Sequence, residues 1–128
     1  MKNFEEITKP LTPDEQNIAA IICKRFKKKP GKINIVTNKQ IVRALKIKCQ
    51  IEITEPRIRK IIQFIRSEGL LNGLIATSSG YWLTRNVDEL KSWIDSMIER
   101  ENAIRSSRHA GERDLRFLIN ETDQGKLF

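Results

Sequence analysis

The chain has 128 residues, of which 39% are hydrophobic and 31% charged, and its 24 lysines and arginines against 16 acidic residues give a formal net charge of +8. This length suits one small domain with extensions. No stretch approaches the roughly 18 apolar residues of a membrane span, and the first ten residues lack the apolar core of a signal peptide. We therefore expect a cytoplasmic protein without a membrane partner.

Residue types that carry catalysis or bind metals are sparse. His109 is the single histidine, and Cys23 and Cys49 lack C-x-x-C spacing. The glycines occur singly, so no phosphate-binding loop is predicted. We expect no enzymatic activity, no catalytic residues, no metal and no cofactor. Both cysteines should be reduced, with Cys23 in a helix core and Cys49 in a turn or at a helix end.

The positive charge is concentrated in one third of the chain. Residues 24–66 contain fourteen lysines and arginines against only Glu52 and Glu55, a local charge of +12, whereas the remainder carries −4. A surface with this charge would bind a polyanion such as DNA, because neutralising its phosphates releases counterions. A membrane surface would also attract it, but the accompanying helices lack an aromatic or leucine face. A nuclease would need a carboxylate cluster there, which two glutamates do not supply.

The first helix is predicted to begin after a flexible lead over residues 1–11. Thr12, Pro13 and Glu15 supply an N-cap, a proline at the first helical position and a capping-box partner. Pro30 and the following glycine end the helix. The β-branched run 33–36 then predicts a small strand.

A second capping box, Thr37 with Gln40, predicts a short helix that ends near Lys46. Segment 47–53 is the expected turn, and part of it could extend either neighbouring helix. The apolar residues that this short helix should bury are Ile41, Ala44 and Leu45.

The third helix, from Thr54 to Gly69, has the clearest periodicity. Isoleucines at 58, 61, 62 and 65 follow i, i+3, i+4 and i+7 spacing, which commits one face to a core. The opposite face is cationic or amide-bearing apart from Phe64, and such side chains can match base edges in a major groove. On an ordinary surface helix the same face would simply be solvated. The candidate base contacts are Arg57, Arg59, Lys60 and Gln63.

Two extended runs, 70–77 and 80–84, flank a Ser-Ser-Gly turn and predict a β-hairpin. At least one of Tyr81 and Trp82 should pack on the core, because alternate strand residues face opposite sides. Two helices followed by a hairpin are the layout of a winged helix-turn-helix, a DNA-reading fold. The candidate phosphate contacts are Lys27, Lys28, Lys32, Lys39, Arg43, Thr54, Arg66, Ser78 and Ser79.

A last helix is predicted over residues 86–108, with Asn86 as its cap. It is longer than a winged core requires, so either it packs across the first helix or it pairs with a second copy to form a homodimer through residues 87–104. Residues 109–128 have no consistent period and are expected to form a mobile tail. The predicted fold is mainly α with a small β-hairpin (α+β), a winged helix-turn-helix over 12–85 with an added long C-terminal helix.

Residues 12–108 resemble the winged helix-turn-helix proteins of tailed bacteriophages and prophages. The resemblance rests on Ile65–Leu70, on the return strand Ser79–Leu83, and on Asp88–Leu90 at the start of the final helix. It implies that the chain binds double-stranded DNA in DNA replication or transcriptional control, with the helix 55–68 in the major groove.

The last five residues are similar to the peptide by which many bacterial replication proteins dock on the sliding clamp. Leu127 and Phe128 could fill a partner's pocket while Gln124 sets the register. Gly125 and Lys126 depart from the usual pattern, and a chain end tucked onto its own domain would explain the same residues. The alternative function is a protein-interaction module that uses the winged domain and the peptide 124–128 to bind the clamp or another replication protein.

Overall fold

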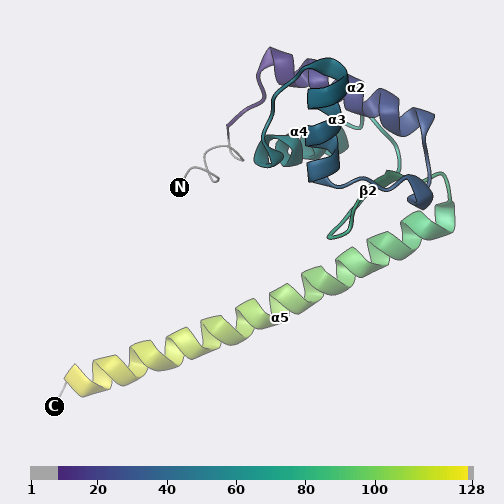
Figure 1. The fold of residues 1–128 in the computed structure, drawn as a ribbon. Coiled ribbons are helices and arrows are strands. Elements are labelled where there is room, and N and C mark those ends of the chain that lie inside the picture. The colour runs from purple at the N-terminus through teal and green to yellow at the C-terminus, as the bar shows by residue number, and fades with distance from the viewer. Residues whose placement is uncertain (1–8, 127–128) are drawn as a thin grey trace. The chain divides into compact units, whose positions relative to one another are not determined.

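The computed structural model describes residues 9–126 of the chain (Figure 1). It is mainly helical and contains one small antiparallel sheet of two strands. The residues up to Leu90 form one compact unit and those from Lys91 onward form another. The elements in chain order are α2 (Pro13–Lys28), the 3-10 turn η1 (Lys32–Asn34), α3 (Asn38–Cys49), α4 (Glu55–Ser67), β1 (Leu74–Thr77), β2 (Gly80–Leu83) and α5 (Val87–Lys126).

Both predicted capping boxes are present. In α2 the Thr12 hydroxyl accepts from the Glu15 N–H at 3.2 Å, and the Glu15 carboxylate accepts from the Thr12 N–H at 2.9 Å. Thr37 and Gln40 repeat this arrangement at the start of α3 with the same two distances. These reciprocal bonds satisfy backbone donors that the helix itself leaves unpaired, so local sequence fixes both helix starts.

Helix α3 and the segment before it differ from the expectation in three respects. The helix continues past Lys46 to Cys49 and ends where Gln50 adopts a left-handed conformation. Ala44 is exposed rather than buried. The run 33–36 is not a strand: residues 33 and 34 belong to the 3-10 turn η1, with Ile33 exposed to solvent, and only Val36 pairs with the sheet, through a bridge to Tyr81.

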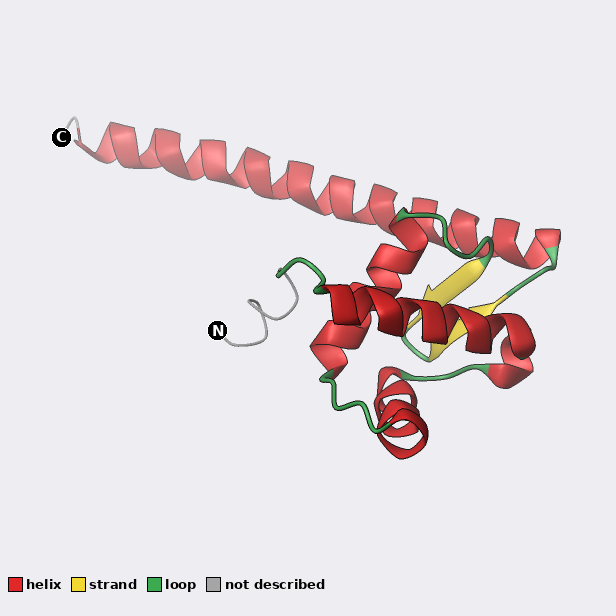
Figure 2. Ribbon diagram, turned by 90° about the horizontal axis from the view of Figure 1, so that it is seen from above, coloured by secondary structure: helices red, strands yellow, loops and turns green. Residues whose placement is uncertain are grey.

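The core of the first unit is built around α4, which packs against both α2 and α3 (Figure 1). As predicted, its isoleucines at 58, 61, 62 and 65 are buried, with at most 3% of each exposed. Figure 2 shows the two strands (yellow) lying beside the helices of this unit, and β2 contacts α2. Tyr81 and Trp82 are both buried, so the expectation that at least one packs on the core is confirmed.

The cysteines occupy the expected positions, and neither is in a disulfide. Cys23 lies in the buried face of α2, and Cys49 is exposed as the last residue of α3. Burial raises the pKa of the Cys23 thiol, which disfavours the reactive thiolate.

The hairpin is joined to the segment before α3 by a close backbone contact at Gly80. Val36 N–H donates to the Tyr81 carbonyl at 3.0 Å, and Tyr81 N–H donates to the Val36 carbonyl at 2.8 Å. Gly80 has a φ of 134°, and a Cβ at this position would lie 2.5 Å from the Val36 oxygen. Glycine is therefore required both for the backbone conformation and for the close approach.

Helix α5 is a single helix of 40 residues, so the predicted end at Arg108 is wrong, and residues 109–126, expected as a mobile tail, are helical. Asn86 caps it as predicted, accepting from the Glu89 N–H at 3.1 Å. Ion pairs one turn apart, Glu101 with Arg105 at 3.5 Å and Arg108 with Glu112, support the extended helix. None of the helices between residues 9 and 126 combines the length and apolar character needed to traverse a bilayer.

Replacing Gly80 by alanine should lower the free energy of unfolding by about 2 kcal/mol, because the new Cβ would strain the backbone and meet the Val36 carbonyl. Urea denaturation followed by far-UV circular dichroism measures the change. Gly111→Ala is the matched control, since Gly111 is helical with no atom within 4 Å of an added Cβ. The control should not destabilise the protein, and equal losses in the two variants would contradict the assignment.

Candidate nucleic-acid interface

Opposite its buried isoleucines, α4 presents a polar surface that we call the basic face of α4, formed by Arg59, Lys60, Gln63 and Arg66. Three of these residues, Arg59, Gln63 and Arg66, are exposed and follow i, i+4 and i+7 spacing along one stripe. Lys60 is half-buried beside this stripe. The first unit therefore displays guanidinium, ammonium and carboxamide groups from one rigid helix.

The side chains predicted to contact phosphates are all exposed, and they come from several elements of the first unit. Lys39 and Arg43 lie one turn apart near the start of α3, and Lys27 and Lys28 occupy the last turn of α2. Thr54 is the N-cap residue of α4, although its side chain makes no capping hydrogen bond. Ser78 and Ser79 form the hairpin turn between β1 and β2, Arg66 belongs to the basic face of α4, and Lys32 lies in η1.

Lys32 is tied to the base of the hairpin. Its Nζ lies 5.5 Å from the centroid of the Trp82 ring, a cation–π contact. The Trp82 indole N–H in turn donates to the Glu89 carboxylate at 2.8 Å, and this hydrogen bond is the main cause that lowers the pKa of Glu89. Lys32 thus has an aromatic neighbour within its own chain, which restricts its freedom to reach a ligand.

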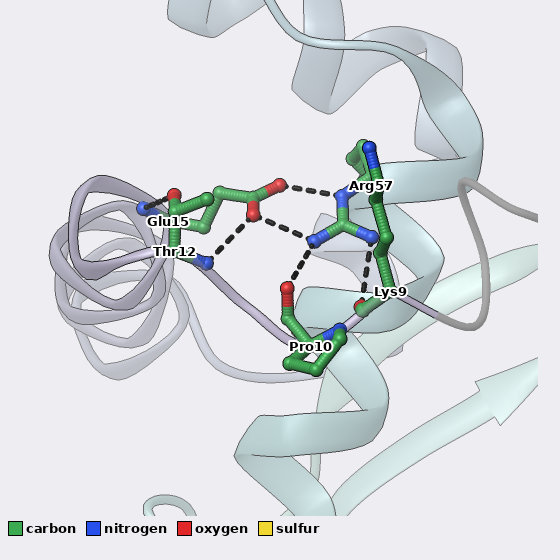
Figure 3. Close-up of polar contacts among 5 residues, drawn as sticks. All are labelled: Lys9, Pro10, Thr12, Glu15 and Arg57. Atoms are coloured by element: carbon green, nitrogen blue, oxygen red, sulfur yellow. Dashed lines mark hydrogen bonds and ion pairs between the residues drawn. The ribbon is translucent and has the colours of Figure 1, made fainter.

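Arg57, also predicted to contact bases, does not belong to the basic face, because its guanidinium is engaged within the chain. Its Nε and one terminal nitrogen donate to the two Glu15 oxygens, each at 2.6 Å (Figure 3). The terminal nitrogens also donate to the carbonyls of Lys9 at 2.9 Å and Pro10 at 3.1 Å. Only 12% of each charged side chain is exposed. Arg57 therefore joins α4 to the start of α2, and its guanidinium is occupied.

The Arg57–Glu15 pair changes the acidity of the carboxylate. Hydrogen bonds from Arg57 lower the pKa of Glu15 from 4.5 to about 2, against an opposing effect of burial and with a further contribution from the Thr12 N–H. A bidentate pair of this kind is among the stronger polar interactions in proteins. Glu15 thus serves at once as capping-box acceptor and as counter-ion for Arg57.

The sequence signals for this pair were weak. Arg57 lies at the margin between the polar and apolar faces of α4, next to Phe64, so helical position alone left its direction open. Its partner stands 42 residues away in the chain. The capping box explains Glu15 without any cation, so nothing local indicated a second role for that residue.

The proposed clamp-docking peptide has no described side chains. Gln124 belongs to the last turn of α5, but its side chain is not described, and Leu127 and Phe128 lie outside the described residues. Within residues 9–126 there is no group of three or more His, Cys, Asp or Glu side chains that could hold a metal ion.

Removing the Arg57 guanidinium should destabilise the first unit. Arg57→Gln leaves the Glu15 carboxylate, 12% exposed, without its counter-ion, and we expect the free energy of unfolding to fall by about 3 kcal/mol. The control is Arg59→Gln, which removes the same charge from an exposed position of the same helix and should change stability by less than about 0.5 kcal/mol. Urea titrations compare the two, and similar losses would refute the structural role of Arg57.

The same pair predicts a pH dependence of stability. Because the folded-state pKa of Glu15 is about 2 and its ordinary value is 4.5, the stabilisation is complete above pH 4.5 and is lost as the pH falls toward 2. The size of this contribution is about 3 kcal/mol. Unfolding free energies measured from pH 6 to pH 2 should fall more steeply for the native chain than for Glu15→Gln, which keeps a capping-box acceptor. Parallel profiles would contradict the assignment.

Comparison of the chain with protein-family models, with curated proteins and with solved structures returned no match in any of the three.

Proposed function

We propose that the chain is a non-enzymatic, double-stranded DNA-binding protein that places α4 in the major groove. The observation that carries the proposal is the division of α4 into two faces. Its four isoleucines are buried, and Arg59 and Gln63 stand exposed on the other side. Arginine matches the acceptors on guanine and glutamine matches the edge of adenine, so this face has the chemistry for base recognition.

The order of the elements supports the same function. Helices α3 and α4 pack against each other and are followed directly by the β1–β2 hairpin, the succession found in winged helix-turn-helix domains. In this arrangement α4 is the recognition helix, and the turn at Ser78 and Ser79 is the tip of the wing. With no cation at the tip, contacts there involve hydroxyls and backbone N–H groups.

The charge distribution supplies the affinity in this proposal. Residues 24–66 carry a local charge of +12, and their exposed cations include Lys39 and Arg43 on α3 and Lys27 and Lys28 at the end of α2. These groups would bind phosphates and give affinity for any duplex, whereas Arg59, Lys60 and Gln63 would select a sequence. The biological setting that we propose is DNA replication or transcriptional control of the phage or prophage type.

Fluorescence anisotropy with a labelled random duplex tests the proposal. If about six phosphates are neutralised, the logarithm of the affinity should fall with the logarithm of the salt concentration with a slope of about −5. A response independent of salt, or no complex in low salt, would overturn the proposal.

The role of α4 is tested by measuring how protein variants bind a duplex selected from a random pool and base-substituted forms of that duplex. Gln63→Ala should lose about 1–3 kcal/mol of discrimination at one base position, whereas Lys39→Ala should weaken all sequences alike. Lys24→Ala is the matched control, because it removes one exposed cation of α2 outside the proposed contact set. An equal effect of Gln63→Ala on every sequence would argue against base reading by α4.

A further inference from the structure

Helix α5 carries a long seam of side chains that remains exposed. Its apolar members include Ile94, Met97 and Ile104 in the first half and Leu115 and Leu118 in the second, each between 39% and 70% exposed. Positions along the seam alternate between steps of three and four residues, which is the spacing of a coiled coil. The seam extends well beyond the segment 87–104 expected from the sequence, because the helix does not end at Arg108.

The seam also contains charges, and these restrict the orientation of any second helix. Glu101 and Arg108 lie on the same stripe as the apolar residues. In a parallel pair in register, Glu101 would face Glu101 of the second copy and Arg108 would face Arg108. Like charges brought together in a desolvated seam oppose association, so this sequence disfavours the parallel arrangement.

We infer that α5 pairs with the α5 of a second copy in antiparallel orientation, with the two-fold axis near Ser106. Around this residue the seam is complementary to itself, because residues at equal separations before and after Ser106 meet across the interface. Ile94 then packs on Leu118 of the second copy, and Met97 packs on Leu115. These apolar contacts lie toward both ends of the seam, and at its centre Ile104 meets Arg108 of the second copy, whose methylene groups can cover the isoleucine.

The central contacts are also complementary. Glu101 faces Gly111 of the second copy, so its carboxylate meets neither an apolar side chain nor a like charge at that position. Arg108 of the second copy is then offset from Glu101 by about 4.5 Å along the axis, which is three residues of helical rise. That separation permits an ion pair between Glu101 and Arg108 of the second copy. The two-fold axis repeats the same pair on its other side.

The charges that flank the seam mostly agree with this register. Arg100 approaches Asp114 of the second copy, a pair of opposite sign. One pair has like charges, because Arg105 lies near Arg105 of the second copy. Each of these arginines already has Glu101 of its own helix 3.5 Å away. The intrahelical pairs seen in the single chain are exposed, and such pairs contribute little, so they compete weakly with pairing between copies.

Sedimentation equilibrium of the full chain without DNA tests the inference. The native chain should form a dimer, and Arg108→Glu should raise its dissociation constant at least tenfold, because Glu101 would then lie near a glutamate of the second copy in place of an arginine. Exchange of both charges, Glu101→Arg with Arg108→Glu, should restore the dimer. Arg113→Glu is the matched control, with the same change of charge on the opposite side of α5. A native chain that stays monomeric, or a charge exchange that fails to restore dimers, would overturn the inference.

Disulfide cross-linking tests the orientation directly. In a Cys49→Ser background, which removes the exposed thiol, Met97→Cys and Leu115→Cys chains should cross-link to each other when mixed. Neither should cross-link when alone, and a disulfide between two Met97→Cys chains would show a parallel pair and refute the antiparallel one. Because these measurements contain no DNA, their failure leaves the proposed DNA binding untouched, and a loss of DNA binding leaves the dimer untouched.

Discussion

Burial of the four isoleucines of α4 determines how the first unit is arranged. Ile58, Ile61 and Ile65 are completely covered, and each contributes roughly 2 kcal/mol through removal of its side chain from water. Rotating α4 about its axis by even one residue would expose part of this surface, so the rotation of the helix is strongly restrained. The same restraint keeps Arg59 and Gln63 directed outward, and the proposed reading face is therefore a consequence of the packing on the other side.

Arg57 shows that a cation on such a helix serves either the fold or a ligand. Its guanidinium donates to the Glu15 carboxylate and to the Lys9 and Pro10 carbonyls, and it is almost fully covered. Releasing it to a nucleic acid would leave a carboxylate of lowered pKa without its counter-ion. Fewer polar side chains of α4 are thus available for recognition than its charge suggests. Those that are available lie toward the middle and the end of the helix.

Much of the first unit was predictable because its signals are local. The capping boxes at Thr12 and Thr37, the isoleucine period of α4 and the glycine that ends it act within a few residues, and the structure confirms each of them. The features that could not be predicted depend on partners distant in sequence or on the sum of several small contributions to helix stability. The Arg57–Glu15 pair is an example of the first kind. The continuation of α5 beyond Arg108 is an example of the second, since helix propensity and ion pairs one turn apart sustain it although Arg108 and Gly111 interrupt the apolar residues of its seam.

The hydrogen bonds from Arg57 to the Lys9 and Pro10 carbonyls bring residues before α2 into the folded unit. A shortened protein designed from the helix boundaries alone would start at Thr12 and would discard both acceptors. Two donors of a nearly buried guanidinium would then have to find water or remain unsatisfied. Expression boundaries for the first unit should therefore be set at Lys9 or earlier, because residues that hold α4 in place lie ahead of α2.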